Sequence, residues 1–168
     1  GTYGAAVGFI SPSVVKTLTP GLMGFRSNSD IWDLRADRLE LPEDASRFEF
    51  TTIHFGAALG LATAIDELLE MGMDEVWRHD LELADHLIRG AEGLGIEVVS
   101  PTSESERSAI VALRMPSGLS SLDVSNRLQS EYSILTTSRS GLLRVSPHID
   151  NDILQIDSLV SALSDILS

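Results

Sequence analysis

Residues 141–151 read Gly141-Leu142-Leu143-Arg144-Val145-Ser146-Pro147-His148-Ile149-Asp150-Asn151. The apolar run with a proline at its end predicts a β-strand over Leu142–Val145, because proline cannot continue a strand ladder. An arginine inside an apolar strand is costly unless it meets an anion, and its planar fork suits a carboxylate. Two interpretations stay open: Arg144 binds a carboxylate ligand, or it reaches the surface of an edge strand or pairs with a structural acid.

The sequence around this strand predicts an α+β layer of two strands, a helix, two strands and a closing helix. Asp150 or Asn151 is expected to cap the closing helix, which repeats apolar residues every three to four positions. The other expected elements are strands at Ile96–Val99, Ala109–Arg114 and Ser133–Thr136, and a helix over Ser120–Gln129.

Two further helices are predicted earlier in the chain, over His54–Met71 and from Asp74, as the cap, to Glu92. The second helix has an expected buried seam of Trp77, Leu81, Ala84, Ile88 and Ala91. Residues 20–50 hold prolines, glycines and many polar residues, and predict a long irregular connection.

The first residues indicate a piece of a larger protein. Gly4–Ile10 has the pattern of a buried strand, yet no methionine or lead-in precedes it. We therefore expect residues 1–52 to end a large domain, 53–93 to form interdomain and small-domain helices, and 94–168 to form a small α+β domain.

Composition excludes several classes of function. The net charge of −13 and the pI near 4.5 leave no basic stripe for nucleic acid. The absence of cysteine excludes a disulfide framework, a thiolate metal site and a cysteine nucleophile. No apolar run is long enough to cross a bilayer and no signal peptide is recognisable, so a cytoplasmic location without membrane contact is expected.

Two local clusters carry weaker signals. His79, Glu82 and His86 share one helix face, which is expected to be solvated rather than a metal site. Thr51 and Thr52 lie before a helix start, where hydroxyl groups and free backbone N–H groups favour an anion such as phosphate. A plain helix cap at these threonines is the alternative.

Four motifs in chain order resemble the class V aminotransferase family of fold-type I pyridoxal-phosphate enzymes, which includes isopenicillin-N-epimerase-like proteins and cysteine desulfurases. The motifs are the strand Gly1–Ile10, then Gly24-Phe25-Arg26-Ser27, Arg47-Phe48-Glu49-Phe50-Thr51-Thr52 and Arg144-Val145-Ser146-Pro147-His148. They are similar to the segment after the family's Lys-Trp-Leu-Leu, to Gly-Trp-Arg-Ser, to Arg-Phe-Glu-x-Gly-Thr and to Arg-Val-Ser-Pro-His.

The resemblance implies an α/β parent enzyme with pyridoxal phosphate, an amino-acid substrate and a homodimer that shares its sites. It assigns Thr52, with Thr51 beside it, to the cofactor phosphate of the neighbouring subunit. It assigns Arg144 to the substrate α-carboxylate and places Arg139 at the same entrance. The Schiff-base lysine would lie upstream of Gly1, because Lys16, the one lysine present, is poorly placed.

Departures from the family pattern direct the functional expectation. Thr51 replaces a glycine, Ile53-His54 replaces Pro-Asn, and no cysteine-bearing loop precedes Arg144. Persulfide chemistry is therefore not expected. The expected reaction is transamination or epimerisation, and the chain alone is expected to be inactive. The alternative is a non-enzymatic α+β ligand-binding or interaction module.

Overall fold

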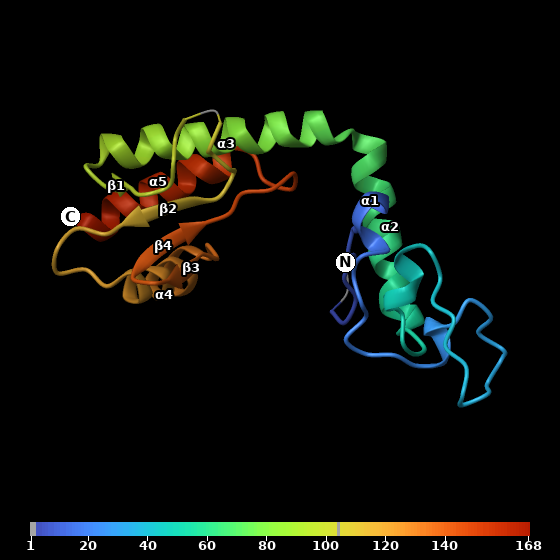
Figure 1. Ribbon diagram of the computed structural model, residues 1–168. Helices are drawn as coiled ribbons and strands as arrows, with labels where there is room; N and C mark the ends of the chain where they lie inside the picture. Colours follow the sequence, from blue (N-terminus) through green and yellow to red (C-terminus); the bar gives the residue numbers. More distant parts are fainter. Residues whose placement is uncertain (1–2, 104) are drawn as a thin grey trace. The chain divides into compact units, whose positions relative to one another are not determined.

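A computed structural model of the chain describes residues 3–103 and 105–168. The contacts within it divide the chain into two units, Gly1–Glu70 and Met71–Ser168. The two units are built differently (Figure 1).

The second unit contains a four-stranded sheet in the order β1-β2-β4-β3, with every neighbouring pair antiparallel. Its elements are α3 (Met73–Gly93), β1 (Glu97–Val98), β2 (Val111–Arg114), α4 (Ser121–Tyr132), β3 (Thr137–Arg139), β4 (Leu142–Val145) and α5 (Ile153–Leu167). The predicted alternation of two strands, a helix, two strands and a closing helix is therefore confirmed.

One face of this sheet carries the core. Side chains that alternate along the strands pack with residues of all three helices. Helix α3 contacts β1 and β2, α4 contacts β3 and β4, and α5 contacts both α3 and α4. The fully buried members include Leu83, Leu87, Leu113, Leu128, Leu143 and Leu163. Because successive strand residues point to opposite faces, Ala112 and Arg144 lie on the face away from these helices.

Several predicted boundaries in this unit were wrong for local reasons. The segment 133–136 is not a strand, because Ser133 adopts a left-handed conformation and the Ile134 N–H closes helix α4 on the Leu128 carbonyl. Strand β3 follows it. Neither Asp150 nor Asn151 caps α5: the cap is Asp152, whose carboxylate accepts the Gln155 N–H at 2.8 Å.

Helix α3 also differs from its prediction. It begins at Met73 after Gly72, so Asp74 lies in the first turn and is not the cap. Its buried side is formed by Val76, Leu83 and Leu87 together with the expected Ala84 and Ala91. Trp77 is 47% exposed, because the core side of the helix is rotated away from the predicted seam.

The first unit has little regular structure before its last helix. It contains α1 (Pro12–Val15), the 3-10 helices η1 (Phe25–Ser27) and η2 (Ala45–Phe48), and α2 (Phe55–Met71). The long irregular connection predicted over residues 20–50 is confirmed, apart from the two short 3-10 turns.

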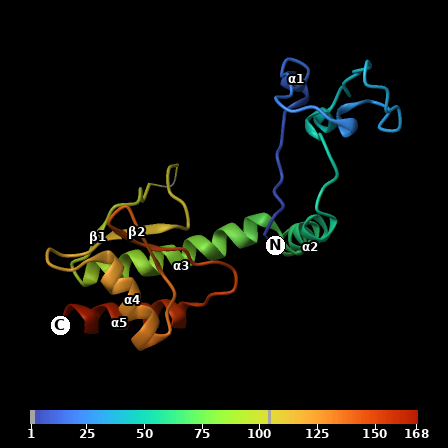
Figure 2. The same cartoon turned by 90° about the horizontal axis from the view of Figure 1, so that it is seen from below.

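The buried strand predicted at Gly4–Ile10 was wrong within the described residues. These residues form no strand, and Val7 and Phe9 are 72% and 86% exposed. A strand needs a neighbour to satisfy its backbone groups, and the described strands all belong to the second unit. Residues 4–7 instead line a hollow of about 400 Å³ with α2, beside which both views show this segment (Figures 1 and 2).

Candidate functional site

Two of the sequence motifs meet in the first unit. The buried Ser27 hydroxyl donates to the Glu49 carbonyl at 2.9 Å, and Arg26 pairs with the Glu49 carboxylate at 2.6 Å. Gly24 packs so closely that a Cβ atom there would lie 2.0 Å from the Phe50 carbonyl oxygen. The contacts with Gly24–Ser27 therefore hold the segment Arg47–Phe50, which leads to the two threonines. These contacts explain why the two motifs occur in the same chain.

Thr51 and Thr52 are exposed, and neither side chain has a hydrogen bond to another residue of the described chain. The cap of α2 is not a threonine: His54 Nδ1 accepts the Ala57 N–H at 2.9 Å. The threonine hydroxyls are thus left as donors, which fits a phosphate in chemistry. The helix end does not need that phosphate, because an imidazole already occupies the capping position.

Lys16 lies on the surface and pairs with Glu43 at 2.8 Å, with 59% of its side chain exposed. This environment is exposed and anionic, whereas a nucleophilic lysine requires a desolvated or cationic environment.

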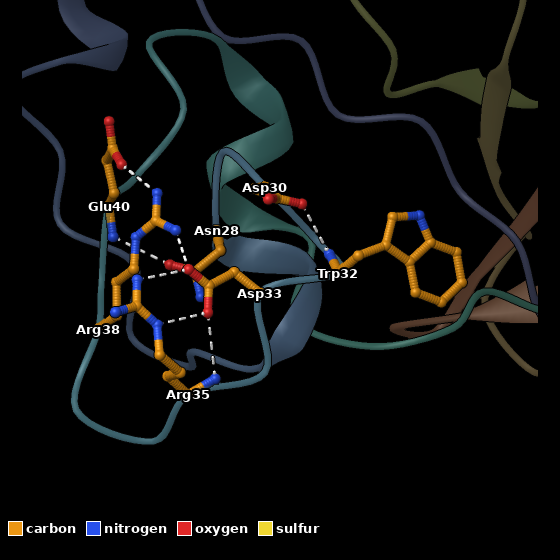
Figure 3. Close-up of polar contacts among 7 residues, drawn as sticks. All are labelled: Asn28, Asp30, Trp32, Asp33, Arg35, Arg38 and Glu40. Carbon is orange, nitrogen blue, oxygen red and sulfur yellow. Dashed lines mark hydrogen bonds and ion pairs between the residues drawn. The ribbon is translucent and has the colours of Figure 1, made fainter.

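The loop between residues 28 and 40 is held by polar contacts (Figure 3). Arg35 donates to both Asp33 oxygens at 2.9 and 2.7 Å, while Arg38 bridges Asp33 and Glu40. The Asn28 side chain accepts the Glu40 N–H at 2.9 Å and so closes the loop base. Arg35 and Arg38 hold the pKa of the Asp33 carboxyl well below its usual range, and Arg38 also lowers that of Glu40.

The predicted substrate residue Arg144 lies in the middle of β4, as the sequence indicated. Its neighbours Leu143 and Val145 point into the core, and the half-buried Arg144 points to the opposite, helix-free face. In register, Arg144 lies between Ala112 of β2 and Thr137 of β3, so β4 is a central strand. No side-chain partner of Arg144 occurs within residues 3–103 and 105–168, which argues against a structural ion pair.

Arg139 lies on the same face through the β3–β4 hairpin. Ser140 and Gly141 form its two-residue turn with φ of 51° and 77°, the backbone of a type I′ turn. Arg139 is paired in register with Leu142, one step along the face from Arg144. The structure thus brings Arg139 and Arg144 together on one sheet face. Thr51 and Thr52 belong to the first unit.

The loop after β4 contains the remainder of the motif that begins at Arg144. The His148 N–H donates to the Asn151 side chain at 3.0 Å, and the Asn151 N–H returns to the His148 carbonyl at 2.8 Å. This turn leads into α5 and lines a hollow of about 330 Å³ with residues 133–136 and the α5 start. Neither arginine lines this hollow, so it is separate from the sheet face that carries them.

The histidine face of α3 was expected to be solvated, which is confirmed for the exposed Glu82 but wrong for the two histidines. His79 Nε2 lies 3.0 Å from the Asn151 carbonyl, and His86 Nε2 lies 2.6 Å from the Asp157 carboxylate. Both histidines contact residues at or before α5, because α3 packs against α5 as well as against the sheet. Among the described residues, no group of three possible ligands is arranged around a metal position.

The chain belongs to the class V aminotransferase family, whose model matches residues 2–158. It is similar to a probable cysteine desulfurase of Pyrococcus abyssi, with 24% identity over 180 residues that cover 99% of this chain and 44% of that protein. The resemblance drawn from the four motifs is confirmed.

Solved structures show the same fold. The apo cysteine desulfurase of Thermococcus onnurineus NA1 has a TM-score of 0.81 at 23% identity, over 94% of this chain and 42% of that one. A C-DES mutant with glycine covalently linked to its PLP cofactor has a TM-score of 0.81 at 21% identity, over 94% and 40%. The predicted fold class, that of the fold-type I pyridoxal-phosphate enzymes, is confirmed. The chain spans less than half the length of these relatives.

No helix within the described residues is both long and apolar enough to span a membrane.

Proposed function

We propose that this chain supplies the substrate-carboxylate site of a pyridoxal-phosphate enzyme that acts on an amino acid by transamination or epimerisation. The observation that carries the proposal is Arg144, which lies on a central strand of an open sheet face without a described partner. In a chain with 25 acidic and 12 basic residues, an arginine without an acid is available for a ligand.

The roles of this chain's residues in such a reaction are binding and orientation. The Arg144 fork would hold the α-carboxylate by two parallel hydrogen bonds, which fixes the position of the α-carbon. The Thr137 hydroxyl, directly opposite Arg144 in the sheet, is placed to donate to the same carboxylate. Pyridoxal phosphate, when bound, withdraws electrons from the α-carbon and so makes its proton removable.

The cofactor contacts of this chain belong to the same proposal. Thr51 and Thr52 would donate to the phosphate of a cofactor held by the second subunit of a homodimer, which is supported by their exposed hydroxyls. The lysine that binds the cofactor would come from sequence outside these 168 residues, which is supported by the ion pair of Lys16 with Glu43. Residues 1–52 would then end the large domain, with 53–93 and 94–168 forming the helices and the small domain.

The reaction branch is proposed from composition. Desulfuration through an enzyme persulfide needs a thiol to receive sulfur, and none of the 168 residues is cysteine. Epimerisation removes the α-proton and returns one to the α-carbon, and transamination also passes the amino group to the cofactor and releases a keto acid by hydrolysis. Neither reaction requires a thiol. The proposal also includes a cytoplasmic location, which follows from the sequence expectation.

The test is the substitution Arg144→Lys in the intact protein, followed by amino-acid affinity and kcat/KM. Loss of the bidentate contact is expected to weaken substrate binding about tenfold or more, since a charge-assisted contact contributes about 1.5–3 kcal/mol. Arg127→Lys is the matched control, because Arg127 pairs with Glu131 on the exposed side of α4. A fall in affinity below threefold for Arg144→Lys would remove Arg144 from the substrate site.

A further inference from the structure

Two arginines lie diagonally on the open face of the β3–β4 pair. Thr137 is opposite Arg144, and Arg139 is opposite Leu142, so the two guanidinium groups start from neighbouring positions of the same face. Diagonal positions in an antiparallel pair are about 7–8 Å apart, within reach of long side chains. Both forks can therefore converge on one small molecule.

Neither Arg139 nor Arg144 forms an ion pair with a described carboxylate, although the protein is strongly acidic. Arg114 on the same face is paired with Glu97 of β1 at 2.9 Å, and most other arginines likewise contact carboxylates. Within the described part of the chain, Arg139 and Arg144 have no side-chain hydrogen bond or ion pair. Two like charges at this spacing repel each other unless an anion lies between them. The third arginine without a described partner, Arg89, lies exposed on α3 and away from the sheet.

We propose that Arg139 and Arg144 together select an amino acid whose side chain bears a second carboxylate. Arg144 would hold the α-carboxylate and Arg139 the side-chain carboxylate, each through its planar fork. The inference rests on the proposed function for Arg144 and adds the substrate class. The fixed turn at Ser140-Gly141 preorganises the pair, because it sets which residues of β3 and β4 are opposite each other.

The test compares glutarate with butyrate, two acids of similar length with two and one carboxylates. They lack the amino group, so their binding does not depend on chemistry at the cofactor. The isolated protein is titrated with each acid while the amide resonances of β3 and β4 are followed by NMR. Glutarate is expected to bind about tenfold more tightly than butyrate, the effect of one added charge-assisted contact.

Three variants show which arginine binds which carboxylate: Arg139→Gln, Arg144→Gln and the control Arg89→Gln. Arg139→Gln is expected to reduce glutarate binding to the level of butyrate and to leave butyrate binding within about twofold of its original value. Arg144→Gln is expected to weaken both acids. Arg89→Gln, which removes an equal charge away from the sheet, is expected to change neither.

Equal binding of the two acids by the unsubstituted protein would overturn the inference. So would unchanged glutarate binding in Arg139→Gln, or tighter binding of inorganic phosphate than of glutarate at the same resonances. Butyrate binding that survives Arg144→Gln would instead overturn the proposed function. If no β3 or β4 resonance moves with any acid, both proposals fail, and retained NMR dispersion of the variants shows that they are folded.

Discussion

The two units of this chain reach their structures by different means. The second unit buries a continuous core, whereas the described apolar residues buried in the first unit are Val15, Pro20 and Ala57. The first unit is instead fixed by hydrogen bonds and ion pairs around Gly24–Ser27, Glu49 and the loop 28–40. It leaves Phe9, Trp32 and Phe55 exposed by 86%, 80% and 67%. The comparison teaches that the sheet face with the arginines belongs to the unit whose stability depends on apolar packing.

The difference in stability can be measured because each unit has one tryptophan. Trp32 lies in the first unit and Trp77 in the second. In a Trp77→Phe background the fluorescence reports the first unit, and in a Trp32→Phe background it reports the second.

The largest effect is expected from Leu143→Ala in β4. Leu143 is fully buried, and loss of such a side chain leaves a cavity that costs about 2–5 kcal/mol of the free energy of unfolding. The Trp77 transition in urea should move to lower denaturant. Leu34→Ala, at a residue of the first unit that is 71% exposed, is the control and should change stability by less than about 0.5 kcal/mol. Equal effects at the two positions would contradict the assignment of the core.

A smaller effect is expected from Gly24→Ala in the first unit. The added methyl group would meet the Phe50 carbonyl oxygen at 2.0 Å, so the backbone must shift, with a cost of about 1–3 kcal/mol. Amide exchange at Ser27 and Glu49 should accelerate, while the Trp77 transition should stay in place. Gly21→Ala is the matched control, because nothing lies within 4 Å of its Cβ position. Unchanged exchange in Gly24→Ala would show that this contact does not fix the segment.

The smallest effect is expected from pH at the loop 28–40. The pKa of Asp33 is lowered by Arg35 and then by Arg38, so the carboxylate stabilises the loop above its unfolded pKa of about 3.9. This contribution is lost as the pH falls from that value through the lower folded pKa. The Trp32 signal in the Trp77→Phe background should therefore change below about pH 4, whereas the Trp77 signal should change less. Asp33→Asn should remove the acid-dependent part, and a profile that is identical with and without Asp33 would contradict the role of this carboxylate.

Sequence reasoning worked best where a pattern is satisfied locally. The run Leu142–Val145 with Pro147 predicted β4, which the structure confirms, and the register of the sheet places Arg144 on the face opposite to Leu143 and Val145. It failed where the answer depends on a partner elsewhere. Gly4–Ile10 has the composition of a buried strand, but no described strand lies beside it to make it one.

The faces of α3 and the caps were missed for a related reason. A helix that packs against both a sheet and α5 has two contact sides, so the histidines that appeared solvated contact Asn151 and Asp157. Asp152 was overlooked as the α5 cap because Asp150, Asn151 and Asp152 are all chemically suited to cap, and only Gln155 distinguishes them. The diagonal placement of Arg139 and Arg144 depends on the strand register. That register was not predicted, because β3 was expected several residues too early.

The two-residue turn at Ser140-Gly141 also fixes which face of the sheet carries the arginines. Side chains alternate between the two faces of a strand, so a slip of β4 by one residue against β3 would exchange inside and outside for the whole strand. Leu143 and Val145 would then face solvent, and Arg144 would face the core. A two-residue loop leaves no slack for such a slip, because Arg139 is held opposite Leu142 directly beside the turn.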